Sequence, residues 1–321
     1  MILFTADVHL KIGAKNVPVE WAKNRYKLFI EQINIAEKGC DLHIMGGDIF
    51  DKIPNMDELE IYFDLVRACS IRTIIYSGNH EATRKGKTFF TALKSATNGL
   101  NPLVTVIDEV YEEDKFTIVP YEFIQVKGIW SSLDKSKALF SHIRGAIEPH
   151  VEPEINLDLI ADFPIVYVGD LHSHSNCQRN LVYPGSPMAT SFHRSRISTG
   201  YLHIDSDDLT KWTWKEFDLP QLIRLTVTDP ADMVATHPDH TIYEVEGSIV
   251  DLGSIKNTDL LDKKLVKRST DTTLILTKNM TIQEELVEYF RYILELPENQ
   301  IQEAISTFHD YIAKTKVGLS I

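Results

Sequence analysis

Four apolar runs in this chain each end abruptly in aspartate, histidine or asparagine residues. The runs and the polar residues after them are Ile2–Phe4 with Asp7 and His9, Leu42–Met45 with Asp48, Thr73–Tyr76 with Asn79 and His80, and Ile165–Val168 with Asp170 and His172. Short β-rich runs bounded by glycine are typical of buried strands. Loops at strand ends carry ligand-binding groups, so convergence of these loops would gather carboxylates, imidazoles and an amide around one point. A divalent-metal site needs such a set, whereas core packing does not.

The composition is that of a globular protein with room for a main core and a second, smaller domain. The chain has 321 residues, of which 43% are hydrophobic and 25% charged. No apolar run approaches the ~20 residues that span a bilayer, and Met1–Phe4 is too short for a signal peptide. Cys40, Cys69 and Cys177 resemble neither a disulfide framework nor a thiolate metal site, which predicts a reducing, cytosolic compartment.

The net charge of −13 argues against a protein that holds DNA by bulk electrostatics. It does not exclude nucleic acid as a substrate, because a local basic surface or a partner subunit can supply affinity.

Strand-like and helix-like segments alternate over the first two hundred or so residues, which indicates an α/β sandwich. The predicted helices are Trp21–Ala36, Glu58–Ala68 and Phe89–Ala96, and further predicted strands are Phe116–Pro120 and Ala138–Phe140. Near Tyr201 the pattern changes to an antiparallel pair, Tyr201–Ile204 with Trp212–Trp214.

A smaller mixed domain follows Pro220. Its predicted elements are strands at Leu222–Val227, Thr241–Val245 and Thr272–Leu276, a helix at Ile282–Leu294, and an amphipathic helix at Glu298–Lys316. The stripe of that last helix, Ile301, Ile305, Phe308 and Ile312, packs either on its own domain or on a partner. We therefore predict domains at residues 1–219 and 220–296, and a terminal helix at 297–321.

The spacing of the polar residues suits a pair of metal ions. Asp7 and His9 stand two apart, so both can reach the same side of a loop, and the glycines before Asp48 allow close approach. Asn79 offers a neutral oxygen, which leaves His80 to face a substrate, and Asp48 is the candidate bridging ligand. Two ions ~3.5–4 Å apart can promote phosphate-ester hydrolysis. Mixed Asp, His and Asn ligands favour Mn²⁺ or Fe²⁺ over a cysteine-rich zinc site.

The motifs Asp-x-His, Gly-Asp and Gly-Asn-His, followed by a variant of Gly-His-x-His, resemble in order the signature of the calcineurin-like metallophosphoesterases. Within that superfamily the chain is most similar to the SbcD-type DNA nucleases, partners of SbcC-type coiled-coil ATPases, and to phage-encoded members in size. Three segments carry this finer resemblance: Gly47–Asp51, Gly78–Glu81 (with glutamate in place of the commoner aspartate) and Tyr183–Pro187. By motif, the resemblance covers roughly residues 1–205.

The resemblance implies a fold and a set of roles. The fold would be a two-sheet αββα sandwich with a smaller C-terminal α+β capping domain for DNA recognition and a terminal helix. Asp7, His9 and His172 would hold one of two divalent ions, most simply Mn²⁺, with Mg²⁺ or Fe²⁺ as alternatives, and Asp48 would bridge. Asn79 and His142 would hold the other ion, although His142 could be an ordinary surface histidine. His80 would assist the scissile phosphate or the leaving oxygen.

One position departs from the family signature. Asp170 stands where the family has the first histidine of its last motif. A carboxylate suits hard divalent ions, so we predict that Asp170 binds the second metal, with His174 as the alternative ligand.

Cationic residues follow several of the motifs and would suit a phosphate backbone, although each cluster could equally be a solvated charge run. The candidate DNA contacts are Arg84, Lys85, Lys87, Arg144, Arg194 and Arg196. No aromatic-interleaved basic stripe is present, which argues against sequence-specific readout.

The resemblance further implies a Mn²⁺-dependent 3′→5′ exonuclease on duplex DNA with endonuclease activity on single strands. It would act as a homodimer in the bacterial host cytoplasm, in DNA end processing, recombination or repair. The helix Glu298–Lys316 would dock on the coiled coil of the ATPase. Two alternatives stay open: a phosphodiesterase or phosphatase acting on nucleotides or phosphoproteins, and a catalytically weak scaffold subunit.

Overall fold

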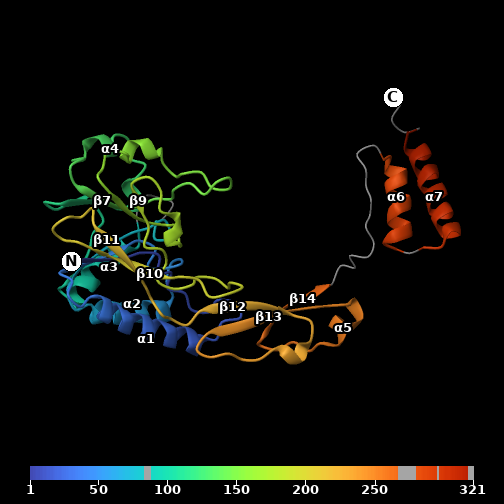
Figure 1. Ribbon diagram of the computed structural model, residues 1–321, viewed down its shortest axis with the longest axis horizontal. Helices are drawn as coiled ribbons and strands as arrows, with labels where there is room; N and C mark the ends of the chain where they lie inside the picture. The colour runs from blue at the N-terminus through green and yellow to red at the C-terminus, as the bar shows by residue number, and fades with distance from the viewer. Residues whose placement is uncertain (83–87, 267–279, 295, 317–321) are drawn as a thin grey trace. The chain divides into compact units, whose positions relative to one another are not determined.

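The computed structural model describes residues 1–82, 88–266, 280–294 and 296–316 (Figure 1). The chain forms two compact units, the first made of residues 1–246 and 254–264 and the second of residues 247–253 and 265–321. The division at residues 219 and 296 stays a prediction.

Two sheets form the centre of the first unit. In spatial order, the six-stranded sheet contains β11 (Trp212–Glu216), β10 (Gly200–Ile204), β1 (Ile2–Thr5), β2 (Leu42–Gly46), β3 (Arg72–Tyr76) and β4 (Val104–Val106). The five-stranded sheet contains β5 (Tyr111–Glu112), β6 (Phe116–Val119), β7 (Ala138–His142), β8 (Val166–Gly169) and β9 (Leu181–Val182). Strands β1 to β4 run parallel, as do β6 to β9, so several strands of each sheet end at the same edge.

The two sheets pack face to face. Alternate side chains of a strand point to opposite faces, so strands of the first sheet, such as β1, contribute to two cores. Phe4 of β1 lies in the core between the sheets with Phe140 and Tyr167 of the second sheet. Its neighbour Leu3 faces the opposite way, into the core under the helices. The rings of Phe140 and Tyr167 stack with centroids 5.0 Å apart.

Helices cover the outer face of the six-stranded sheet (Figure 1). They are α1 (Val19–Ala36), α2 (Met56–Ala68) and α3 (Phe90–Leu100). Helix α2 begins with a capping box between Asn55 and Glu58. The short α4 (Ile129–Ser132) and a 3₁₀ turn at Leu157–Ile160 cover the second sheet. These four layers confirm the predicted αββα sandwich.

A third, three-stranded sheet completes the first unit. It contains β12 (Leu222–Val227), β13 (His240–Gly247) and β14 (Leu261–Val266), with β12 and β13 parallel. The predicted strand Thr272–Leu276 lies outside the described residues.

The second unit contains helices α6 (Ile282–Tyr292) and α7 (Glu298–Lys316) and most of α5 (Ile249–Ser254). Ile301 and Ile305 of α7 are buried, at 0% and 6% exposure. Across the described residues, no helix has the length and apolarity needed to cross a membrane.

A chain of polar contacts among the buried Thr5, His43 and Glu37 ties the end of α1 to the first sheet. Thr5 Oγ1 lies 2.9 Å from His43 Nε2, and His43 Nδ1 lies 3.1 Å from Glu37 Oε1. The second Glu37 oxygen accepts hydrogen bonds from the Ser70 amide and hydroxyl. Burial alone would raise the pKa of Glu37, but the hydrogen bonds from His43 and Ser70 outweigh it and hold that pKa below its usual value.

We expect Glu37→Ala to lower the free energy of unfolding by about 3–5 kcal/mol, because it leaves the buried His43 ring without its hydrogen-bond partner. Urea denaturation followed by circular dichroism measures the change. Glu31→Ala, an exposed position on the same helix, is the control and should change stability by less than about 0.5 kcal/mol. Equal effects of the two substitutions would show that the buried chain does not stabilise the fold.

Candidate metal centre

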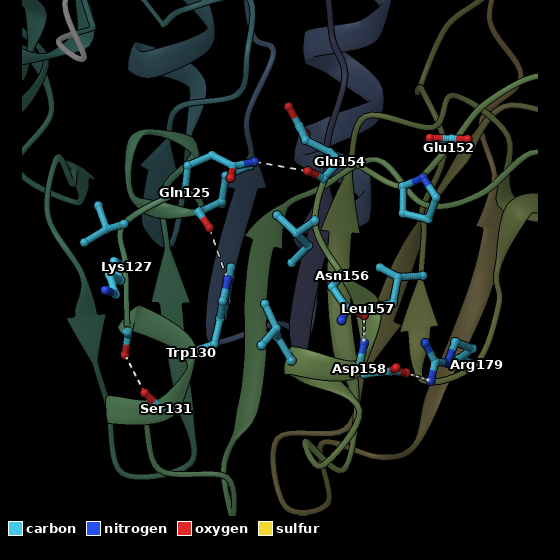
Figure 2. Close-up of a pocket in the computed structure, with 16 residues that line it drawn as sticks. Gln125, Lys127, Trp130, Ser131, Glu152, Glu154, Asn156, Leu157, Asp158 and Arg179 are labelled. Atoms are coloured by element: carbon cyan, nitrogen blue, oxygen red, sulfur yellow. Dashed lines mark hydrogen bonds and ion pairs between the residues drawn. The ribbon is translucent and has the colours of Figure 1, made fainter.

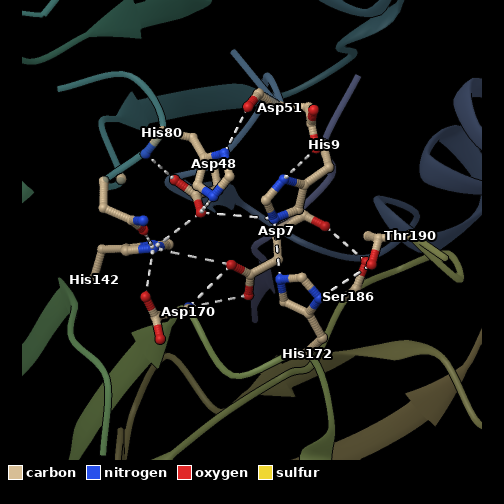
Figure 3. Close-up of polar contacts among 12 residues, drawn as sticks. Asp7, His9, Asp48, Asp51, His80, His142, Asp170, His172, Ser186 and Thr190 are labelled. Carbon is tan, nitrogen blue, oxygen red and sulfur yellow. Dashed lines mark hydrogen bonds and ion pairs between the residues drawn. The ribbon is translucent and has the colours of Figure 1, made fainter. Parts of the chain in front are cut away.

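The predicted ligands come together at one end of the two central sheets (Figure 3). Asp7 and His9 follow β1, Asp48 follows β2, and Asn79 and His80 follow β3. His142 is the last residue of β7, and Asp170 and His172 follow β8. The carboxyl ends of parallel strands from both sheets therefore build a single site, as the strand-end pattern predicted.

The backbone turns sharply where it presents these side chains. Asp7, His9, Asp48 and Asp170 have φ angles of 57°, 49°, 51° and 99°, a region that non-glycine residues rarely adopt. Such strained residues cluster at functional sites, where the surrounding structure holds them in place. Gly78 allows the close approach, because a Cβ there would lie 2.2 Å from Asp48 Oδ1.

One group of acceptors is formed by Asp7, His9 and His172. The Nε2 atoms of His9 and His172 are 3.0 Å apart. Two imidazole nitrogens this close would suit a shared divalent ion. Thr190 Oγ1 lies 3.1 Å from His172 Nδ1, and it would accept the Nδ1 proton in the tautomer whose Nε2 binds a metal.

A second group surrounds His142 Nε2. This atom lies 3.0 Å from Asn79 Oδ1, 3.4 Å from Asp48 Oδ2 and 3.9 Å from Asp170 Oδ1. His142 Nδ1 lies 2.9 Å from the Gly46 carbonyl and donates to it, so Nε2 is the ring nitrogen that would face a metal ion.

The orientation of the Asn79 amide bears on whether the second group can hold a cation. As placed, Asn79 Oδ1 faces only acceptors, and only a rotated amide would donate to Asp48 and Asp170. A cation among these atoms would satisfy Oδ1 without rotation, because Oδ1, Nε2 and the carboxylates would all be ligands. The donor set therefore fits a hard or borderline divalent ion.

The electrostatics of the site also favour cations. Burial, with the nearby charges of Asp48 and Asp170, raises the pKa of Asp7 to about 8, although His142 opposes this. Burial lowers the pKa of His9 to about 3 and also lowers the pKa of His172. These histidines are therefore neutral at physiological pH, the form that binds metals. Three carboxylates crowded in a buried site need compensating positive charge.

Asp48 lies between the two groups. Its Oδ2 is 3.6 Å from His9 Nε2 and 3.4 Å from His142 Nε2, so one carboxylate faces both clusters. This is the position that a bridging ligand of two metal ions requires.

His80 lies at the edge of the site and is partly exposed, with a side-chain exposure of 36%. Its Nδ1 donates to the Asp51 carbonyl at 2.6 Å, and its Nε2 is 3.9 Å from Asp48 Oδ2. Geometry also permits a ligand group of His9, Asp48 and His80. The non-ligand role of His80 is therefore a prediction that needs a test of metal content.

The structure places Asp170 and His174 differently. Asp170 faces His142, and its amide donates to Asp7 Oδ1 at 2.9 Å. His174 lies 2.6 Å from the Tyr183 carbonyl through Nδ1 and stacks on Trp214 with ring centroids 5.3 Å apart. This arrangement favours Asp170 as the ligand.

Of the predicted DNA contacts that the structure describes, Arg144 lies near the centre, and Arg194 and Arg196 form ion pairs elsewhere. Arg144 is near enough to lower the pKa of Asp170, in opposition to the larger effect of burial. Arg194 pairs with Glu244 at 2.5 Å, and Arg196 pairs with Asp239 at 2.6 Å and with Asp218 at 2.9 Å. Arg84, Lys85 and Lys87 lie outside the described residues.

Comparisons with known proteins agree with this centre. Residues 1–174 match the calcineurin-like phosphoesterase family. The chain belongs to this family. It is 38% identical to the "Probable exonuclease subunit 1" of Escherichia phage T5, over 97% of this chain and 98% of the relative. It is also 27% identical to a phosphoesterase of Invertebrate iridescent virus 3 over 62% of this chain and 60% of that protein. A phosphoesterase of Invertebrate iridescent virus 6 is 25% identical over 73% of this chain and 88% of its own length.

This phosphoesterase uses two buried residues to hold its ligand loops. The Glu81 carboxylate accepts hydrogen bonds from the amides of Asp48, Phe50 and Gly78 at 2.8–2.9 Å. The Ser186 hydroxyl donates to the Asp7 carbonyl at 2.7 Å, and its amide donates to the His172 carbonyl at 3.0 Å. In the sequence Glu81 and Ser186 stand out only as parts of family motifs, because contacts to the backbone leave no pattern of residue spacing.

We expect Glu81→Gln to lower the free energy of unfolding by about 2–4 kcal/mol, because the new amide group would face a backbone N–H in place of an acceptor. Metal affinity should fall as well, since the loops of Asp48 and Asn79 lose their common anchor. Denaturant titration and equilibrium dialysis measure the two effects. The exposed Glu60→Gln is the control, and a Glu81→Gln protein that matches it would exclude the anchoring role.

A separate cleft of about 800 Å³ is lined by residues of the segments 124–131 and 152–159 and by Arg179 (Figure 2). Gln125, Trp130, Glu154, Asp158 and Arg179 are among the residues that line it. None of the predicted ligands lines this cleft. Glu154 connects its wall to the centre, because its Oε1 accepts the Tyr121 hydroxyl at 2.5 Å and Tyr121 contacts the His142 ring.

Proposed function

We propose that this phosphoesterase is a DNA nuclease subunit. It would act with Mn²⁺ as a 3′→5′ exonuclease on duplex DNA and as an endonuclease on single strands, in DNA end processing, recombination or repair. The observation that carries the proposal is the joint presence of the acceptor groups around Asp48 and the near full-length similarity to a phage exonuclease subunit. The proposed compartment is the cytoplasm of a bacterial host.

The proposed roles follow from the geometry. Asp7, His9 and His172 would hold one ion, Asn79, His142 and Asp170 the other, and Asp48 would bridge them. Bound divalent ions would supply a nucleophile at neutral pH and neutralise charge on the phosphate. His80 would donate a hydrogen bond or proton from Nε2 to the phosphate or the leaving oxygen, because its Nδ1 proton is committed to the Asp51 carbonyl.

A cationic surface on the three-stranded sheet supports a polyanionic substrate. Glu244 is paired with Arg194, Arg224 and Lys263, at distances of 2.5, 3.9 and 3.5 Å. Asp262 pairs with Arg224 at 3.0 Å and with Lys15 at 3.6 Å. The two carboxylates Glu244 and Asp262 thus have four cationic partners, which leaves a positive excess within this group although the whole chain has a net charge of −13. Phosphate contacts of this kind position a duplex without reading its sequence.

The partner would be an SbcC-like coiled-coil ATPase, and the nuclease would act as a homodimer. The predicted contact is the helix Glu298–Lys316. Because Ile301 and Ile305 are already buried, we propose that the exposed apolar side chains of α6 share in the docking. Tyr289, Tyr292 and Ile293 are 41–45% exposed.

The proposal is tested by offering the purified protein three substrates with Mn²⁺, with and without the ATPase. The substrates are end-labelled duplex DNA, bis-p-nitrophenyl phosphate and a phosphopeptide. We expect cleavage of the DNA and of the diester. Hydrolysis of the phosphopeptide alone would replace the nuclease with a phosphatase, and no activity with metal bound would indicate a scaffold subunit.

A further inference from the structure

Arg25 on α1 is a buried cation with no ion pair within 4.0 Å among the described residues, and the more distant Asp239, which acts on its charge, is itself paired with Arg196 at 2.6 Å. Its side chain belongs to a residue only 7% exposed, and Nη2 donates to the Ala189 carbonyl at 2.7 Å. The Nε atom is buried and has no partner. The centroid of the Trp21 ring lies 5.5 Å from the guanidinium carbon. This cation–π contact offsets only part of the hydration energy that the guanidinium loses on burial. Burial of an unpaired charge is costly, so another group is expected to meet this guanidinium.

A small pocket of about 30 Å³ lies beside Arg25. His9, Asp51 and Thr190 also line it, so the pocket adjoins the metal centre. Its volume corresponds to roughly one oxygen atom or water molecule. A nucleobase is therefore too large to enter, whereas one oxygen of a phosphate fits.

The charges around the pocket leave Arg25 as the group available to an anion. Lys11 also lines the pocket, but its Nζ is paired with Asp51 Oδ2 at 2.8 Å. Tyr26 also lines the pocket, and its hydroxyl donates to the His9 carbonyl at 3.2 Å. The pocket thus places a guanidinium that has no close ion pair next to the metal ligand His9.

We infer that Arg25 is a phosphate-binding residue of this enzyme, which receives one oxygen of a backbone phosphate next to the scissile one. The inference rests on the proposed function, since it requires a nucleic-acid strand at the metal centre. It adds a subsite on the side of His9 and α1, at a pocket that Leu222 of β12 also lines. Guanidinium groups suit phosphate oxygens because their N–H groups are fixed in a plane.

Binding of a fluorescent single-stranded oligonucleotide at several salt concentrations tests the inference. All proteins carry His80→Ala so that the strand stays intact. We expect Arg25→Gln to weaken binding about tenfold and to lower the slope of log K against log salt by about 1. Lys27→Gln, which removes a charge from an exposed position of the same helix, should leave the slope unchanged.

The outcomes separate a binding role from a structural one. An unchanged salt slope in Arg25→Gln would overturn the inference and leave Arg25 as a support for the Ala189 carbonyl. If Arg25→Gln does not fold, Arg25→Lys replaces it as the test. This variant keeps the charge, so it should bind the oligonucleotide about threefold more weakly with an unchanged salt slope. Binding by Arg25→Lys as tight as that of the protein with Arg25 would overturn the inference. Absence of DNA cleavage by the protein without His80→Ala would contradict the proposed function. It would not by itself contradict the role of Arg25, since the binding measurement does not need cleavage.

Discussion

Replacement of His80 by alanine is expected to slow phosphodiester cleavage by about 10²–10⁴-fold while both metal ions stay bound. The reason lies in the two ring nitrogens. Nδ1 donates to the Asp51 carbonyl, so Nε2 is the atom that can serve the substrate. Its distance of 3.9 Å from Asp48 Oδ2 keeps it near the centre without direct contact. Single-turnover kinetics and metal analysis by mass spectrometry measure the two quantities.

Asn79→Ala is the matched control for His80→Ala, because it changes the preceding residue in the same loop. It should lose both activity and one ion, since Asn79 Oδ1 lies 3.0 Å from His142 Nε2. Metal loss in His80→Ala comparable with that in Asn79→Ala would make His80 a ligand, as the group of His9, Asp48 and His80 also permits.

Asp170→Ala is expected to reduce the metal content from about two ions per chain to about one, with a corresponding loss of cleavage. Asp170 Oδ1 lies 3.9 Å from His142 Nε2, on the side of the second group. Burial raises the pKa of Asp170, and a cation beside this carboxyl would favour its charged, ligating form.

His174→Ala is the control that distinguishes the two candidate ligands. His174 is two residues beyond His172, but its ring stacks on Trp214 and hydrogen-bonds to the Tyr183 carbonyl. We expect this variant to keep both ions and to lose some stability. If Asp170→Ala kept both ions and His174→Ala lost one, the metal ligand would be His174 and not Asp170.

The sequence predicted the sandwich and the meeting of the ligand loops because both follow from local patterns. A short apolar run that ends in Gly47 and Asp48 marks a buried strand and its carboxyl end without reference to the rest of the fold. Parallel strands then bring such ends to one edge. The helices were predicted equally well, since α1 and α2 carry apolar residues at helical spacing.

Other features depend on contacts between distant residues and left no local signal. Strands β4, β5 and β9 are two or three residues long, too short for a periodic pattern, and β14 contains Asp262, Lys263 and Lys264. The ion pair of Arg194 with Glu244 joins residues fifty positions apart. The burial of Arg25 could not be foreseen either, because a lone arginine in an amphipathic helix is normally exposed.

Anomalous diffraction at the manganese edge from crystals grown with Mn²⁺ tests whether Asp48 bridges two ions. We expect two peaks, one bounded by Asp7, His9 and His172 and the other by Asn79, His142 and Asp170, with Asp48 between them. A single peak, or a second peak that does not contact Asp48, would contradict this bridging role.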